Sequence, residues 1–216
     1  MLGATGGIGS AVVAELRRRG TEVTGLSRRD GLDLTRQDSV IRMARALEPQ
    51  RFGLIFNAIG ALEIESHAPE KTISAIRAEG MAAQFALNAT GTALALSHFS
   101  PLLQQHGPAV FASLSARVGS IGDNRLGGWI SYRAAKAAQN QILRTAAIEL
   151  ARRNPQVIVI ALHPGTVRTR LSAPYAVRHP TISAEVSARG LLDVIARLTP
   201  EDNGGFYDWR GEPVEW

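Results

Sequence analysis

Two kinds of hydrophobic pattern alternate along the chain. Short apolar runs predict buried strands, and apolar positions spaced three and four residues apart predict helices that each bury one face. Strands are expected near 22–27, 53–57, 108–114, 156–162 and 205–209. Helices are expected near 8–19, 37–47, 80–99, 131–153 and 184–198. This alternation predicts an α/β fold of three layers, a doubly wound parallel sheet with helices on both faces, in a single domain over residues 1–216.

Two places depart from a complete sheet. A glycine-rich nucleotide loop normally follows a buried strand, but only Met1 and Leu2 precede Gly3. Either the natural N-terminus lies upstream or the first strand is truncated to a stub. The segment Arg28–Thr35 runs from the end of one expected strand to the pair Asp33-Leu34 and leaves no room for a helix between them. We therefore expect the sheet to lack one edge strand and its crossover.

Composition narrows the class of protein. Hydrophobic residues make up 45% of the chain and charged residues 20%, as in ordinary globular proteins. No apolar run reaches the roughly 18–20 residues of a membrane span, and no signal peptide is visible. The absence of cysteine excludes disulfides, thiol chemistry and cysteine-ligated metals. These features favour a cytoplasmic protein.

The net charge of +5 does not indicate a nucleic-acid partner. The arginine runs Arg17–Arg19 and Arg152–Arg153 fall at the ends of expected helices, where the helix dipole favours cations. No two of the five histidines have the spacing of metal ligands, so no metal site is expected.

A glycine-rich segment, Gly3-Ala-Thr-Gly-Gly-Ile-Gly9, opens the first expected helix. Glycines let the backbone approach a pyrophosphate, whose charge the helix N-terminus stabilises. The segment therefore predicts a dinucleotide site that includes the residues Gly3, Thr5, Gly7, Ile8 and Gly9. The spacing fits both Gly-x-x-x-Gly-x-Gly and Gly-x-x-Gly-x-x-Gly, and the short chain favours the first because it has no room for a second domain.

The strand expected at 22–27 leads into Ser27-Arg28-Arg29. NAD enzymes of this architecture place an acidic residue there for the ribose 2′-hydroxyl. A serine does not repel a 2′-phosphate, and a guanidinium can bind one bidentately, so we expect NADP(H) rather than NAD(H). Further cofactor contacts are expected at the carboxyl edge of the sheet, from Asp33, Leu34, Asn57, Ala58 and Gly60.

Tyr132 and Lys136 are four residues apart and share one face of an expected helix. A phenol has an ordinary pKa of about 10, and a neighbouring ammonium lowers it by stabilising the phenolate. This pairing is suited to general acid–base catalysis. Of 24 basic residues only Lys71 and Lys136 are lysines, which indicates that Lys136 stands where an ammonium is required.

The motifs of this chain, and their order along it, resemble those of the short-chain dehydrogenase/reductase family. The motifs are the glycine loop, Asn57-Ala-Ile-Gly60, Asn88-Ala-Thr-Gly91, Ser113-Leu-Ser115, Tyr132-x-x-x-Lys136 and His163-Pro-Gly-Thr166. Within the family the chain is similar to the small carbonyl-reductase-like branch of C-factor-like and sniffer-like proteins, and its ending Phe206–Gly211 is part of that likeness. The resemblance implies a Rossmann fold.

The resemblance also implies roles. Ser115 would polarise the substrate oxygen, and Tyr132 would exchange a proton with it. Lys136 would bind the ribose and lower the tyrosine pKa, and Asn88 would hold a water that feeds a proton relay. The nicotinamide side of the cofactor would be lined by Pro164, Gly165, Thr166, Val167 and Thr169, and Asp33 would neighbour the adenine.

Ser113 competes with Ser115 for the catalytic role. Strand alternation sends both side chains to the same side, and Ser115 is favoured because it is closer to the carboxyl end of the strand. The gap of 17 residues from Ser115 to Tyr132 is longer than the family usually shows, and Gly119–Gly128 is interpreted as a loop insertion.

The predicted function is NADP(H)-dependent hydride transfer between the nicotinamide and a small carbonyl or alcohol substrate. The alternative is a non-catalytic NADP(H)-binding sensor or signalling protein. A short apolar lid is expected over Arg170–Ser183. We expect a homodimer or homotetramer. Its interface would be formed by the helices near 80–99 and 131–153, with their small residues Ala82, Ala83, Ala86, Ala134, Ala135, Ala138, Ala146 and Ala147.

Overall fold

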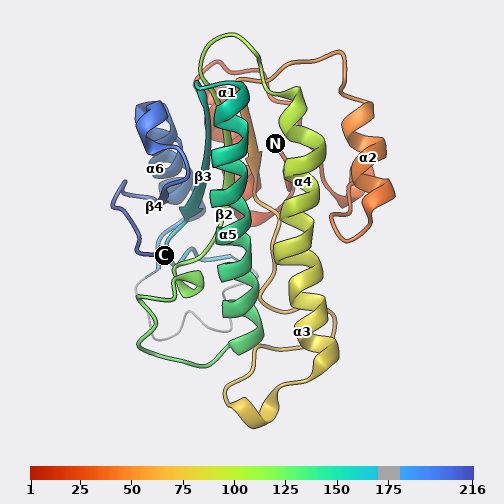
Figure 1. Ribbon diagram of the computed structural model, residues 1–216, viewed down its shortest axis with the longest axis vertical. Helices are drawn as coiled ribbons and strands as arrows, with labels where there is room; N and C mark the ends of the chain where they lie inside the picture. The colour runs from red at the N-terminus through yellow and green to blue at the C-terminus, as the bar shows by residue number, and fades with distance from the viewer. Residues whose placement is uncertain (170–180) are drawn as a thin grey trace.

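A computed structural model describes residues 1–169 and 181–216 of the chain (Figure 1). Its sheet has four parallel strands in the order β1-β2-β3-β4. The strands are β1 Leu54–Asn57, β2 Ala109–Leu114, β3 Val157–His163 and β4 Phe206–Asp208. The expected parallel sheet with helices on both faces is confirmed, and four of the five expected strands are present.

The prediction of a strand at 22–27 is wrong. Only Leu26 of that segment pairs, through a single parallel bridge to Leu2, which also bridges Asn57. The Leu26 amide donates to Met1 O at 2.8 Å and the Leu2 amide to Phe56 O at 2.8 Å. In the sequence given, the first strand is therefore reduced to the pairing of Leu2, which agrees with both alternatives. It offers too few backbone groups to order a full neighbouring strand.

The expected loss of one edge strand is also confirmed. Between Leu26 and β1 the chain forms a short 3₁₀ turn, η1 Arg28–Asp30, and the helix α2 Gln37–Arg45, but no strand. Gly31 turns the chain with a φ of 92°. Leu32 and Leu34 are then buried in the core without pairing in the sheet.

Helices cover both faces of the sheet because successive strand residues point to opposite sides. On one face, β-strand residues such as Ile160 pack against α1 Gly7–Arg18 and α6 Ala184–Arg197. On the other, residues such as Phe111 pack against α2, α4 Gly91–Phe99 and α5 Ile130–Arg153. Figure 1 shows α4 and α5 side by side in front of the sheet.

The helix expected over 80–99 is present but interrupted. It consists of α3 Ala78–Gln84, a π-helical segment η3 Phe85–Thr90, and α4. Short 3₁₀ turns complete the described elements, namely η2 Ile73–Ala75, η4 Ser100–Leu102, η5 Arg117–Gly119 and η7 Pro200–Asp202. No helix in the described ranges is long and apolar enough to span a membrane.

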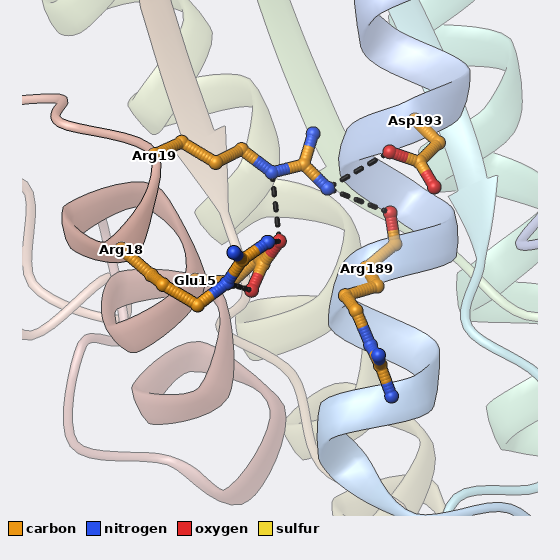
Figure 2. A network of polar contacts seen from close by, with 5 residues as sticks. All are labelled: Glu15, Arg18, Arg19, Arg189 and Asp193. Atoms are coloured by element: carbon orange, nitrogen blue, oxygen red, sulfur yellow. Dashed lines mark hydrogen bonds and ion pairs between the residues drawn. The ribbon is translucent and has the colours of Figure 1, made fainter.

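A polar network ties α1 to α6 (Figure 2). Glu15, 8% exposed, accepts hydrogen bonds from Arg18 and from Arg19 Nε at 2.8 Å. Arg19 Nη2 continues across to Asp193 Oδ1 at 2.8 Å and to the Arg189 carbonyl at 3.5 Å. The arginine run expected to be a solvated helix end therefore also joins two helices that are far apart in sequence.

Candidate functional site

The predicted catalytic side chains come from three elements that meet at the carboxyl end of the sheet. Ser115 follows β2 directly, Tyr132 and Lys136 lie in the first turns of α5, and Asn88 lies in η3. The segments that follow parallel strands gather at this edge, where open α/β sheets bind ligands. The lid expected over Arg170–Ser183 lies, up to residue 180, outside the described residues.

The N-terminus of α5 is capped from a distant loop. Trp129 precedes the helix with a φ of 52° and offers no capping side chain. Glu70 caps it instead, because its carboxylate accepts from the Ser131 amide at 3.2 Å and from the Ser131 hydroxyl, and its carbonyl accepts from Trp129 N at 2.5 Å. Burial acts to raise the pKa of Glu70, but hydrogen bonds from Ser131 and from the Glu70 backbone together outweigh it and lower the pKa.

Tyr132 and Lys136 lie together one turn into α5. Lys136 Nζ is 5.9 Å from the centroid of the Tyr132 ring, and the Trp129 ring meets the same tyrosine edge-on at 6.5 Å. Lys136 is 3% exposed, and this burial lowers its pKa to about 7. Burial raises the pKa of the Tyr132 phenol, so the expected lowering of this pKa by Lys136 is wrong for the protein without ligands. At neutral pH the tyrosine is therefore protonated and able to donate a proton.

The Lys136 ammonium donates hydrogen bonds to two oxygen atoms that were not predicted from the sequence. Its Nζ donates to the Leu114 carbonyl at 3.2 Å and to Gln139 Oε1 at 2.8 Å. Gln139 is completely buried. A glutamine three residues after Lys136 on a helix that packs against the sheet was the available signal, because buried amides require partners.

Asn88 and Lys136 approach each other across Gly60. A Cβ atom at Gly60 would lie 2.9 Å from Asn88 Oδ1 and 3.2 Å from Lys136 Nζ, so a larger residue there would require these side chains to move. The Asn88 side chain binds both backbone groups of Ala61, accepting at 3.2 Å and donating at 2.9 Å. It also donates to Gln84 Oε1 at 2.7 Å. The π-helical turn that carries Asn88 is a type of irregularity frequent at functional sites.

The two candidate serines differ in their partners. Ser115 is 3% exposed, and its hydroxyl donates to Asn140 Oδ1 at 2.6 Å. Ser113 is completely buried, and its oxygen accepts from Asn57 Nδ2 at 3.1 Å and from Gln139 Nε2 at 3.0 Å. Both serines thus face buried amides of neighbouring elements.

The glycine loop has the form that a diphosphate requires. Gly6 precedes α1 without a capping side chain, and no acidic residue stands in the first turn, so the helix N-terminus is open to an anion. A Cβ at Gly9 would lie 2.1 Å from Gly3 O, which makes glycine obligatory there. A Cβ at Gly7 would lie 2.8 Å from Thr169 Cγ2, so Thr169 stands beside the loop. Thr5 is exposed and Ile8 half-buried.

The segment after Leu26 places two arginines on the surface. The Ser27 side chain is buried, caps η1 through the Arg29 amide and donates to Asp30 at 2.6 Å. Arg28 and Arg29 are exposed. The serine therefore shapes the turn, and the two arginines lie at the surface.

Asp33 and Leu34 follow with different surroundings. Hydrogen bonds from Thr35 hold the Asp33 carboxylate and lower its pKa. Leu34 is 1% exposed and packs closely against Gly91 of α4. A Cβ atom added at Gly91 would lie 3.0 Å from Leu34 Cβ. The Leu34 side chain is thus part of the core and offers no surface to a ligand.

The remaining predicted residues follow β1 and β3. Ala58 donates its amide to Leu2 O, which ties the end of β1 to the first-strand stub. Beyond His163, the Pro164 carbonyl accepts from the Ser187 hydroxyl at 2.7 Å, and Gly165 has a φ of 80°. Thr166 and Val167 continue the turn, with Val167 bridged to Ile182.

Burial lowers the pKa of His163 to about 4, so this histidine is neutral. Its Nδ1 accepts a hydrogen bond from the Arg117 amide.

Comparison with known proteins identifies the family. A model of short-chain dehydrogenases, described as enoyl-(acyl carrier protein) reductase, matches residues 31–206. The chain is 29% identical over 231 residues to the 1-hydroxy-2-glutathionyl-2-methyl-3-butene dehydrogenase of Rhodococcus sp. (strain AD45), covering 100% of this chain and 98% of the relative. It is 38% identical over 136 residues to the C-signal of Myxococcus xanthus, covering 63% and 78% of the two chains.

The fold has close counterparts among solved structures. The NADPH-bound carbonyl reductase from chicken fatty liver matches with a TM-score of 0.85 at 23% identity, covering 100% of this chain and 97% of that one. Its Rossmann architecture is the one expected from the motifs. The family match over most of the chain and the relatives along its whole length show that the protein belongs to the short-chain dehydrogenase/reductase family and is an oxidoreductase of this type.

Proposed function

We propose that the protein transfers a hydride between NADP(H) and a small carbonyl or alcohol substrate, with Tyr132 as the general acid and base. The observation that carries the proposal is the pairing of Tyr132 with Lys136 Nζ, 5.9 Å from its ring centroid, at the carboxyl end of β2 in a chain of this family. The pairing brings a proton donor and an ammonium to the edge where ligands of α/β sheets bind.

The residues present fit a dinucleotide. The open N-terminus of α1 and the close-packed glycines of its loop would hold the diphosphate, with Thr169 beside them. Asn57, at the end of β1, and the turn after His163 would flank the nicotinamide half. When bound, the nicotinamide supplies or accepts the hydride.

The cofactor of this proposal is NADP(H) and not NAD(H). Arg28 and Arg29 are exposed just after the Leu26 bridge, where the adenosine ribose would lie, and guanidinium groups bind phosphate bidentately. No acidic side chain replaces Ser27 at the end of that segment to bind a 2′-hydroxyl. The chicken-liver carbonyl reductase of the same fold has NADPH bound.

In reduction, Tyr132 gives its phenolic proton to the substrate oxygen as the carbonyl carbon takes the hydride, and an alcohol forms. The raised pKa of the buried phenol keeps that proton in place at neutral pH. Lys136 stabilises the phenolate left behind, and Asn88, facing Lys136 across Gly60, stands where a water could return the proton.

Ser115 is retained as the residue that polarises the substrate oxygen. To do so, its hydroxyl must exchange the hydrogen bond to Asn140 for one to the substrate, which needs a rotation about one side-chain torsion. Ser113 is the alternative, but its oxygen already accepts from two buried amides.

Turnover tests the proposal. Purified protein is mixed with NADPH and a panel of aldehydes and ketones, and NADPH absorbance is followed. We expect oxidation with at least one carbonyl, and loss of nearly all of it in Tyr132→Phe while NADPH binding persists. Tyr207→Phe is the matched control, because the Tyr207 hydroxyl binds Asp202 away from the site. Full activity in Tyr132→Phe would contradict the assignment.

A second candidate function is a non-catalytic NADP(H)-binding sensor. The similarity to a protein named C-signal favours considering it. A sensor needs no proton donor, so Tyr132→Phe would then leave the cofactor affinity and any biological response unchanged. Tight NADPH binding without turnover across a broad carbonyl panel would favour this function.

We also propose that α4 and α5 form the interface of a homodimer or homotetramer. These helices lie side by side on the outer face of the molecule (Figure 1), and Ile148 of α5 is 49% exposed. Ala134, Ala138 and Ala146 retain exposed surface, whereas Ala135 and Ala147 are buried within the subunit and cannot contribute. Light scattering after size exclusion should show a mass at least twice the 23.1 kDa of the chain.

A further inference from the structure

Gln139 connects Lys136 to the end of β2 through three hydrogen bonds. Its Oε1 accepts from Lys136 Nζ at 2.8 Å, and its Nε2 donates to Ser113 Oγ and to the Leu114 carbonyl, both at 3.0 Å. The side chain is completely buried. It is therefore a fully satisfied amide inside the protein, where an unpaired polar group would be costly.

The chemistry of its neighbours permits only one orientation of this amide. An ammonium only donates hydrogen bonds, so the Gln139 oxygen must face Lys136. A backbone carbonyl only accepts, so the Gln139 nitrogen must face Leu114. Ser113 is in turn fixed by Asn57 Nδ2 at 3.1 Å. A continuous chain of buried hydrogen bonds thus runs from the end of β1 to the catalytic ammonium.

Within residues 1–169 and 181–216, Lys136 has no charged partner. The neutral groups that face Lys136 from the surrounding elements are Gly60, Asn88, the Leu114 carbonyl and Gly119. Tyr132 also faces it and is titratable. Among the described residues its ammonium is held only by the Leu114 and Gln139 oxygens. Gln139 therefore supplies half of the acceptors that keep a buried cation in place.

We propose that Gln139 is the positioning residue of Lys136, holding its ammonium against the end of β2 and favouring its charged form. With two N–H groups given to Leu114 and Gln139, the third remains for the side of the group that faces Tyr132 and Gly60. This inference rests on the proposed function only for its consequence in catalysis. The hydrogen bonds and their effect on Lys136 exist without substrate.

The titration of Lys136 tests the proposal directly. Protein labelled with ¹³C and ¹⁵N in lysine gives two side-chain signals, because Lys71 and Lys136 are the only lysines. The exposed Lys71 serves as internal control. In Gln139→Leu, the loss of one acceptor should lower the pKa of Lys136 by about one unit or more. In Gln139→Glu, a carboxylate beside the ammonium should raise it by about one unit or more.

Gln141→Leu and Gln141→Glu are the matched controls, because Gln141 lies on the same helix with an exposed side chain. Neither should move the Lys136 signal by more than a few tenths of a unit. If Gln139→Leu does not fold, the nearly isosteric Gln139→Glu still decides. An unchanged Lys136 pKa in a folded Gln139 variant would overturn the proposal. Because no substrate is present, this outcome is distinct from a failure of the proposed turnover.

Discussion

The Ser115 hydroxyl donates a 2.6 Å hydrogen bond to Asn140 Oδ1, one helical turn beyond Lys136 on α5. The bond joins the end of β2 to the helix that carries Tyr132. It gives Ser115 two conceivable effects on turnover, one through the substrate oxygen and one through the placement of α5. Variants of the two partners separate these effects.

If Ser115 polarises the substrate, Ser115→Ala should lower kcat by about 100-fold or more, the usual loss for a transition-state hydrogen-bond donor. Asn140→Ala frees the hydroxyl and should cost much less. Equal losses in both variants would instead assign Ser115 to positioning α5. A larger loss in Ser113→Ala than in Ser115→Ala would move the catalytic role to Ser113. Steady-state kinetics with thermal melting of each variant distinguish these outcomes.

Arg28 and Arg29 are expected to set the preference for NADPH over NADH. Removing both guanidinium groups in Arg28→Ala/Arg29→Ala should raise the KM for NADPH by about tenfold or more, the scale of a lost charge-assisted hydrogen bond, and leave the KM for NADH nearly unchanged. Arg42→Ala, an exposed arginine on α2, is the control. Parallel changes in both constants would show that these arginines do not read the 2′-phosphate.

The burial of Lys136 predicts that the free protein becomes more stable as pH rises. Its pKa falls from 10.5 to about 7 on folding, so between these values the unfolded chain binds more protons than the folded one. This group alone should raise the free energy of unfolding by up to about 1.4 kcal/mol per pH unit. Urea denaturation between pH 8.5 and 9.5 measures the slope, because the Met1 amino group titrates mainly below this window and the tyrosines Tyr132 and Tyr207, whose ordinary pKa is 10.0, titrate above it.

Lys136→Met removes the titrating group and should flatten that slope. Lys71→Met should leave it as in the wild type, because Lys71 is exposed. A slope that persists unchanged in Lys136→Met would mean that another group causes it.

The Glu15 carboxylate is expected to stay ionised in moderately acidic solution. Hydrogen bonds from Arg18 and Arg19 lower its pKa to about 2, so its stabilising effect is complete above about pH 4.5 and is lost as pH falls towards 2. The difference in urea midpoint between wild type and Glu15→Gln should therefore be constant from pH 7 to 5 and shrink below pH 4.5. Glu149→Gln removes an exposed ion pair with Arg153 at 3.5 Å and should change the midpoint little at any pH.

Local pattern was enough to predict much of this protein. The alternation of strand and helix signals predicted β1, β2, β3 and β4 to within two residues at each end. The four-residue spacing of Tyr132 and Lys136 predicted a shared helix face, because the α-helix repeats every 3.6 residues whatever surrounds it. The glycine loop was predicted for the same kind of reason, since a Cβ at Gly9 would collide with a carbonyl six residues earlier.

The partners of the site residues were decided by the tertiary structure. The segment 22–27 was predicted to be a strand, but the short first strand leaves Leu26 alone to pair. Glu70 caps a helix 61 residues away, and the Ser115 hydroxyl meets an amide 25 residues later. A hydrogen bond depends on where two side chains lie after folding, and neither periodicity nor spacing encodes that position for residues far apart in the chain. The sequence alone thus determined which residues could do the chemistry, and the packing of α5 on β2 decided that Gln139 is the amide that holds Lys136.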